Sequence, residues 1–159
     1  MVYGRRINMV EALNVANSIL YRAFNENIDI TPMKMQKMIY LVYKSYYKRT
    51  DKKLFDEKFE VWKYGPVLPS VYDAFKVNGA NAIREYHKES NGSVFVVNED
   101  TSRNFKDVLD LIWNKYKHYD GIRLSEMTHR KNTAWWKAVQ RKDKYLDDQD
   151  ISKEENYVK

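Results

Sequence analysis

The sequence predicts a mainly α fold: a single compact domain of several helices with a small two-stranded β-hairpin. Apolar residues recur at helical spacing over most of the chain, capping residues precede several of these segments, and one turn signal stands before a β-branched run. With 159 residues, 43% of them hydrophobic and 31% charged, the chain is long enough to enclose one core.

The composition also bears on where the protein works. Cysteine is absent, which excludes disulfides and fits a reducing compartment. Polar residues interrupt the N-terminal apolar run, so we read no signal peptide, and no segment approaches the ~18 unbroken apolar residues that a membrane span needs. We therefore expect a soluble, cytoplasmic protein.

The first two helices are predicted over residues 9–25 and 32–49. Thr31 is a suitable N-cap for the second helix, and Pro32 suits its first position, where a missing N–H costs no hydrogen bond. One face of this helix is apolar, and the opposite face, with four lysines, is expected to be exposed to solvent: Lys34, Lys37, Lys44 and Lys48. The tyrosines between the two faces make this helix a candidate partner surface: Tyr40, Tyr43 and Tyr47.

Residues 54–64 are expected to be extended or irregular, and a short helix is predicted from Pro69 to Val77. Asn91-Gly92 precedes the run "SVFVV", which predicts a β-hairpin of residues 85–89 and 93–97. Further helices are predicted from Thr101 or Ser102 to about His118, and near 122–128 and 132–141.

The last part of the chain is acidic. Residues 145–159 hold two basic and five acidic side chains, and Ser152-Lys153-Glu154-Glu155 is a capping-box pattern for a final, half-formed helix. We therefore assign residues 1–145 to the domain and 146–159 to an acidic C-terminal tail.

No set of residues in the sequence is typical of an enzyme. The five glycines are scattered, so neither a phosphate loop nor a dinucleotide fingerprint is present, and the three histidines lack metal-ligand spacing. Ser125, Glu126 and His129 are close in sequence, but one helical turn does not by itself arrange a nucleophile, a base and an acid. We expect Ser125 and Glu126 to face water and His129 to make a structural hydrogen bond. The predictions are therefore no catalytic residue, no metal and no cofactor.

The net charge of +6 is concentrated in two basic blocks. Residues 34–63 hold nine basic and four acidic side chains, and residues 123–144 hold seven and two. A solvated lysine surface explains this better than a nucleic-acid interface, because arginine, the better base reader, is scarce and no recognition helix is identifiable.

Aromatic residues supply the other signal, at 14% of the chain. Trp113 lies on a helix face and is expected in the core. The adjacent Trp135 and Trp136 point about 100° apart on a helix, so we expect one of them at the surface or in a groove. The segment "VWKYGPVLPSVYDAF", residues 61–75, concentrates aromatic side chains around Gly65, Pro66 and Pro69. It predicts a rigid turn whose following helix points Tyr72 and Phe75 inward.

Three stretches, residues 33–43, 59–76 and 124–139, together resemble the Panacea domain, the SocA-like antitoxin family that also occurs in phage-associated GepA-type proteins. The resemblance covers residues 10–141 and implies a compact, mainly helical domain without catalysis. It further implies that the protein neutralises a separately encoded toxin, by direct binding or by delivering it to a protease. The residues that match the family are Gln36, Lys37, Trp62, Tyr64, Gly65, Pro66, Val67, Pro69, Tyr72, Thr128, His129 and Trp135.

The favoured function is a protein-binding module, an antitoxin that binds its toxin with an aromatic and basic surface. Its expected partner-binding residues are Lys37, Tyr40, Trp62, Tyr64, Trp135 and Trp136, and the remaining family residues are expected to support the fold. One alternative is a phage- or prophage-encoded protein that binds a host defence or regulatory protein. A third is nucleic-acid binding through the lysines of residues 34–48 and the basic block 130–144.

Overall fold

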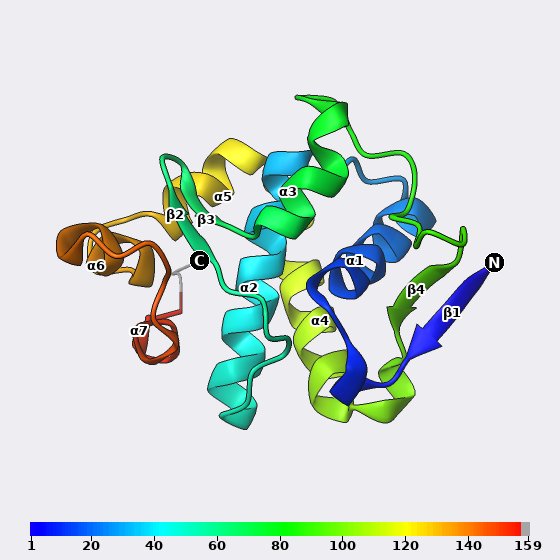
Figure 1. Ribbon diagram of the computed structural model, residues 1–159, viewed down its shortest axis with the longest axis horizontal. Coiled ribbons are helices and arrows are strands. Elements are labelled where there is room, and N and C mark those ends of the chain that lie inside the picture. Colours follow the sequence, from blue (N-terminus) through cyan, green and yellow to red (C-terminus); the bar gives the residue numbers. More distant parts are fainter. Residues whose placement is uncertain (157–159) are drawn as a thin grey trace.

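The computed structural model describes residues 1–156 and confirms a mainly α fold. Most of the chain lies in helices that surround one long central helix, with short strands at two places (Figure 1). The helices are α1 (Ala12–Glu26), α2 (Pro32–Thr50), α3 (Pro69–Phe75), α4 (Arg103–Tyr116), α5 (Gly121–Thr128), α6 (Ala134–Arg141) and α7 (Asp148–Lys153). Three single 3-10 turns are η1 (Ile7–Met9), η2 (Lys76–Asn78) and η3 (Glu99–Thr101).

Helix α2 is the centre of the fold. It begins as predicted, with the Thr31 hydroxyl accepting a hydrogen bond from the Lys34 N–H and Pro32 at the first position. Helices α1, α4, α5 and α7 all pack against it (Figure 1). Because other elements surround this helix, most side chains on both of its sides are buried.

The prediction of a solvated lysine face on α2 is therefore wrong. Lys34, Lys37 and Lys44 are buried, and Lys48 alone of the four is exposed. Each buried ammonium group meets an oxygen: Lys34 donates to the Lys117 carbonyl, and Lys44 pairs with the Glu154 carboxylate. Helical spacing shows which residues share a face, but it does not show that oxygens of other elements cover that face.

The strands differ from the predicted hairpin. Strand β4 (Val94–Val97) exists, but it pairs in parallel with β1 (Val2–Arg5), with Val2 opposite Val94. The antiparallel hairpin is formed instead by β2 (Glu60–Trp62) and β3 (Gly65–Val67), inside the aromatic segment. The Asn91-Gly92 turn leaves two backbone hydrogen bonds, from the Glu89 N–H to the Ser93 carbonyl and from the Gly92 N–H to the Glu89 carbonyl. In place of the predicted hairpin partner, the N-terminal strand β1 makes the backbone hydrogen bonds to β4. Local sequence does not reveal this pairing, because the two strands are far apart in the chain.

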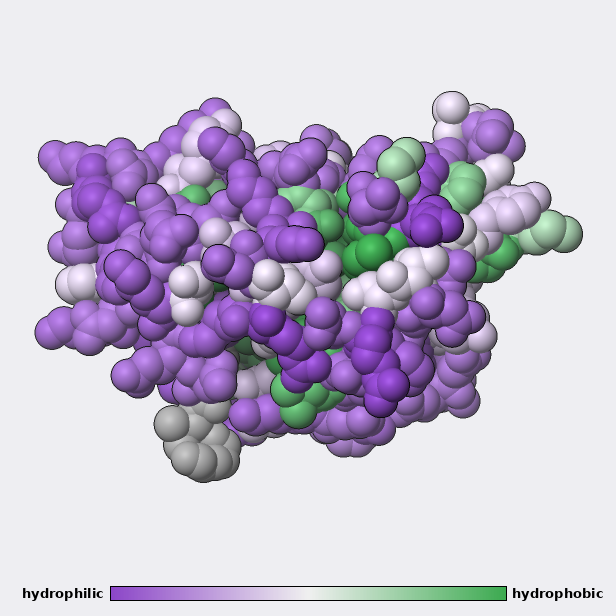
Figure 2. Space-filling view, turned by 90° about the horizontal axis from the view of Figure 1, so that it is seen from below, coloured by the Kyte–Doolittle hydropathy of each residue, from purple (hydrophilic) through white to green (hydrophobic). Residues whose placement is uncertain are grey.

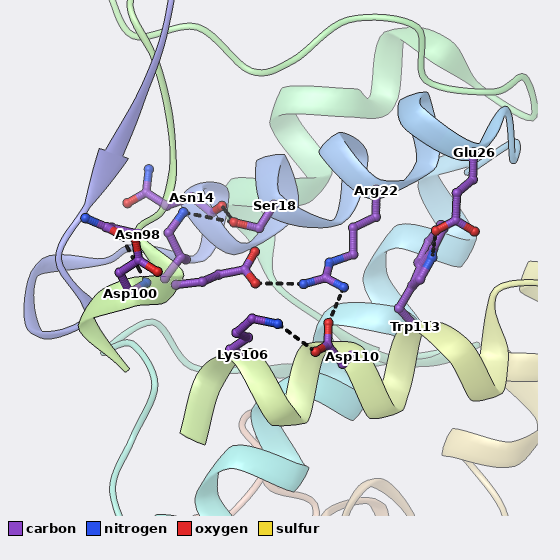
Figure 3. A network of polar contacts seen from close by, with 11 residues as sticks. Asn14, Ser18, Arg22, Glu26, Asn98, Asp100, Lys106, Asp110 and Trp113 are labelled. Carbon is purple, nitrogen blue, oxygen red and sulfur yellow. Dashed lines mark hydrogen bonds and ion pairs between the residues drawn. The ribbon is translucent and has the colours of Figure 1, made fainter. Parts of the chain in front are cut away.

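Helices α1 and α4 are joined by a polar network at the edge of the core (Figure 3). Arg22 of α1 pairs with Asp110 of α4 and with Glu99, while Lys106 binds the second oxygen of Asp110. Trp113 is in the core, as predicted, and its Nε1 donates to Glu26 at 2.8 Å. These contacts satisfy polar groups between two helices, and their role is structural.

The C-terminal helix lies earlier than predicted. Its N-cap is Asp147, whose carboxylate accepts from the N–H groups of Gln149 and Asp150, and Ser152 is inside the helix. Ile151 and Glu154 are buried against the rest of the fold. The acidic segment is thus packed against the domain as far as it is described, while the end of the predicted tail, residues 157–159, lies outside the described residues.

Hydrophilic side chains cover most of the face shown in Figure 2, and the hydrophobic ones gather toward the side that bears β1. None of the helices in the described part of the chain has the length and apolar character to span a membrane.

Candidate partner-binding groove

The β2–β3 hairpin is attached to helix α2 by two adjacent side chains. The Gln36 amide donates to the Leu68 carbonyl at 3.1 Å and accepts from the Leu68 N–H at 2.8 Å. Lys37 Nζ donates to the Pro66 carbonyl at 2.9 Å. The helix thus supplies the hydrogen bonds that a neighbouring strand would otherwise make, and the hairpin is fixed directly above it.

Gly65 allows the hairpin to lie this close. Its φ of 115° is in a region that glycine adopts readily and other residues rarely do. A Cβ atom at this position would lie 3.1 Å from Thr128 Oγ1 and 3.2 Å from Lys37 Nζ. Ser125 Oγ donates to the carbonyl of the neighbouring Tyr64. Ser125 is therefore buried rather than facing water, whereas Glu126 is exposed as predicted.

The other edge of the hairpin is also occupied. The Val61 N–H donates to the Lys144 carbonyl at 2.9 Å, so the segment after α6 runs along β2. Trp135 Nε1 donates to the Trp62 carbonyl at 2.7 Å, and the His129 ring lies against Trp135 with centroids 5.3 Å apart. His129 Nδ1 is hydrogen-bonded to the Ser125 carbonyl, which confirms its predicted structural role. The hairpin is thus held by hydrogen bonds on both edges.

Between this hairpin, α3 and the first turns of α2 lies an apolar groove of about 390 Å³. Its lining residues are Pro32, Met33, Gln36, Lys37, Trp62, Lys63, Tyr64, Val67, Val71, Tyr72 and Gly79. The rings of Trp62 and Tyr72 are in contact, with centroids 4.8 Å apart. Tyr64 is 55% exposed and Tyr72 is 42% exposed. The elements that form the groove lie together at the top of Figure 1.

The predicted inward position of Tyr72 is wrong, whereas Phe75 is in the core as predicted. On α3 it is Val71, one residue earlier, that is buried beneath the groove. Val71 and Phe75 are four residues apart and share the buried side of this short helix, whereas Tyr72 points away from that side and its exposed ring contacts Trp62.

Lys37 is the one charged residue in the floor of the groove. It is 2% exposed, and burial lowers the pKa of its ammonium group from 10.5 to about 7. Within the described residues, no carboxylate lies within ion-pair distance of it. The groove therefore combines an apolar lining with a buried amine that, when protonated, has no carboxylate partner there.

The structure brings together three of the six predicted partner-binding residues: Lys37, Trp62 and Tyr64 line the same groove. Tyr40 is fully buried and donates to Glu154, so it cannot reach a partner in this conformation. Trp135 and Trp136 are both half-buried, and neither lines the groove. Trp135 supports the hairpin from behind, and Trp136 lies on the same helix, α6, which packs against β2.

Sequence reasoning missed Met33, Lys63 and Val71 as groove residues. Met33 is the second residue of α2. It is 38% exposed, which distinguishes it from the methionines of the core. The separation of Val71 from Trp62 conceals that they share one site. No group of His, Cys, Asp or Glu side chains within residues 1–156 is placed to hold a metal ion.

These features define a mainly α domain in which a long buried helix is hydrogen-bonded to an aromatic hairpin, and an open groove lies beside that hairpin. The family model for the antitoxin SocA-like Panacea domain matches residues 35–136, and the chain belongs to this family. The match begins in α2, just before Gln36, and ends with the tryptophan pair of α6. It confirms the family that the three sequence stretches resemble.

A curated relative is the antitoxin SocA of Caulobacter vibrioides (strain NA1000 / CB15N), which is 36% identical over 74 residues. The aligned part is 46% of this chain and 39% of that relative, so it covers well under two thirds of the relative's length. No solved structure matches the chain. Both the name of this relative and the description of the family refer to an antitoxin.

Proposed function

We propose that the protein is an antitoxin that neutralises a cognate protein toxin by direct binding, and that the groove between the hairpin, α2 and α3 is the binding site. Membership of the SocA-like family supports the class of function. The observation that supports this site is an apolar groove with two exposed tyrosines in its lining, Tyr64 and Tyr72.

The physical properties of the groove suit protein binding. Aromatic side chains that stay partly exposed around an apolar hollow are typical of interface centres, where they contribute much of the binding energy. The hairpin is fixed on both edges by hydrogen bonds, so little conformational entropy is lost when a partner binds. Trp136, half-buried on α6, extends the proposed surface beyond the groove.

The experiment is co-expression with the protein encoded by the adjacent gene, followed by growth assays and co-purification. We expect the neighbouring protein to be toxic alone, harmless with this chain, and recovered in a complex. Tyr72→Ala and Tyr64→Ala should weaken both effects. Tyr21→Ala is the matched control, because Tyr21 is 49% exposed on α1 and does not line the groove. A harmless neighbour that does not co-purify would contradict the proposal.

The same experiment separates blocking from delivery to a protease. If direct binding neutralises the toxin, its cellular level stays constant when the antitoxin is expressed. If the antitoxin acts as a proteolytic adaptor, the toxin level falls and recovers in a protease-deficient host. A complex with a host protein, in place of the neighbouring protein, would favour the alternative of a phage-encoded inhibitor.

A further inference from the structure

We propose that the groove binds an acidic segment of the partner, with an apolar side chain packed against Trp62 and Tyr72 and a neighbouring carboxylate paired with Lys37 and Lys63. This inference rests on the proposed function, since it names the chemistry of the segment that the binding site recognises. Two features of the groove carry it: the charges of its lining residues, and the contrast between two buried lysines of the same helix.

The groove is positively charged. Its lining includes Lys37 and Lys63 and no acidic residue. Lys63 is exposed at the tip of the hairpin, where its ammonium group lies 5.4 Å from the centre of the Tyr64 ring. In the part of the chain that the structure describes, neither lysine has a carboxylate within ion-pair distance. A partner that brings a carboxylate to this place would meet the Lys63 ammonium group, would favour the protonated form of Lys37, and would meet no competing internal anion.

Lys44 is a buried lysine whose charge is neutralised by a carboxylate of the same chain, and it can be compared with Lys37. Lys44 lies two helical turns after Lys37 on α2, and both residues are 2% exposed. The Lys44 ammonium group has a buried carboxylate at 3.0 Å, that of Glu154. The Lys37 ammonium group, which carries three N–H donors, instead donates a hydrogen bond to an uncharged acceptor, the Pro66 carbonyl.

This contrast matters because a buried charge is costly without a counter-charge. A neutral donor would also make the bond to the Pro66 carbonyl, so this bond alone does not account for an ionisable group at the position. The position of Lys37 in the floor of an open groove leaves room for the missing anion to come from outside. A carboxylate there would gain a charge-assisted hydrogen bond in a site of low dielectric constant.

The other lining residues of the groove indicate which apolar side chain the partner segment would carry. Trp62, Val67, Val71 and Tyr72 form a wall with few polar atoms, and the hollow of about 390 Å³ has room for a large aliphatic or aromatic side chain. The chemistry that fits is therefore an Asp or Glu next to a large apolar residue, presented by an exposed segment of the partner.

A nucleic acid is a poorer fit. Aromatic rings and lysines also bind single strands, but that mode needs cations along a surface track for the phosphates. The lysines of α2 do not form one, because three of the four are buried and Lys34 and Lys44 are bound to internal oxygens. Lys37 is 2% exposed beneath the hairpin, so it does not add to a surface track of cations.

The test selects peptides from a random library displayed on phage, using the full chain as the target. We expect the selected sequences to place Asp or Glu beside a large apolar residue. A synthetic peptide of the selected sequence should bind by calorimetry, and its Asn or Gln counterpart should bind about tenfold more weakly or worse. Lys63→Gln and Lys37→Met should each weaken the acidic peptide by a similar factor and leave its amide counterpart unchanged.

Lys52→Gln is the control, because Lys52 is exposed beyond the far end of α2 and does not line the groove. Lys63→Gln alters an exposed side chain, so it gives a result even where Lys37→Met perturbs the hairpin. Selected sequences that are neutral or basic, no selected sequence, equal binding to the lysine variants, or displacement of the peptide by short oligothymidylate would each overturn the inference. If Lys37→Met and Lys63→Gln still neutralise the toxin with unchanged affinity, the proposed function stands and this inference fails.

Discussion

The side-chain amide of Gln36 pairs with both backbone polar groups of Leu68, donating to the carbonyl at 3.1 Å and accepting from the N–H at 2.8 Å. Leu68 is fully buried and joins the hairpin to α3. One side chain of the central helix thus fixes the point at which the two elements of the groove meet. The neighbouring Lys37 adds a single hydrogen bond, to the Pro66 carbonyl, so α2 fixes both the position of the hairpin and the shape of the groove.

Gln36→Met is expected to destabilise the protein by roughly 2–4 kcal/mol, because it leaves a buried N–H and a buried carbonyl without their partner at similar side-chain volume. Urea unfolding followed by circular dichroism measures the effect. Gln140→Met is the control, since Gln140 is exposed on α6. Equal midpoints for the two variants would show that the Leu68 contact contributes little.

Gly65→Ala is expected to cost about 1–3 kcal/mol from backbone strain, with a further cost from contact with Lys37 Nζ and Thr128 Oγ1. Gly92→Ala separates the two causes, because Gly92 also has a positive φ, of 87°, but a Cβ there meets nothing within 4 Å. The Gly65 variant should therefore have the lower melting temperature. A larger loss in the Gly92 variant would contradict the close approach of the hairpin to α2.

Lys37 should make the stability of the protein depend on pH. Its pKa is about 7 in the folded state and 10.5 in the reference state, so between these values the unfolded chain binds more protons. The free energy of unfolding then rises as the pH increases from about 7 to 10.5, and the cost of burying the charge is fully present below pH 7. The change is on the order of 3–5 kcal/mol for a shift of this size.

Lys37→Met removes this dependence, so the difference in unfolding free energy between the two proteins should change across that pH range. Comparing the two proteins at each pH cancels other titrating groups, such as Tyr43, whose pKa is raised by burial and by Asp148. Urea titrations at several pH values provide the measurement. A difference that stays constant from pH 6 to 10 would show that Lys37 is solvated in the folded protein.

Much of the helical fold could be predicted from sequence, because caps and helical spacing are local. Thr31 with Pro32 marked the start of α2 correctly, and Trp113, which was expected in the core, is buried on α4. The β1–β4 pairing could not be predicted, because the residues that pair, such as Val2 and Val94, are far apart in sequence.

The candidate site was only partly predictable, for a similar reason. The aromatic segment contained Trp62 and Tyr64, and both line the groove. Burial of Lys37, Lys44 and Tyr40 depends on elements that pack onto α2 from elsewhere in the chain, and amphipathic spacing alone assigned the lysines to solvent. Oxygens such as those of Glu154 and Pro66 are visible as partners only in three dimensions.

The pair formed by Lys44 and Glu154 links the C-terminal segment to the centre of the fold. Both side chains are 3% exposed, and Glu154 also accepts hydrogen bonds from the Tyr40 hydroxyl and from the Ala134 N–H at the start of α6. Glu154→Gln should cost about 3–5 kcal/mol, because it leaves Lys44 buried without this carboxylate and weakens the attachment of α6. Chemical unfolding of the variant measures the loss.

The double variant Glu154→Gln with Lys44→Met tests whether the charge is the cause. Removing the buried cation should restore part of the stability, so the effects of the two substitutions should not add. Asp73→Asn is the control, because Asp73 and Lys76 form an exposed pair on α3 and η2, for which a change of about 0–1 kcal/mol is expected. If the stability losses of Glu154→Gln and Lys44→Met add in the double variant, and Asp73→Asn costs as much as Glu154→Gln, then the C-terminal segment is not held by a buried ion pair.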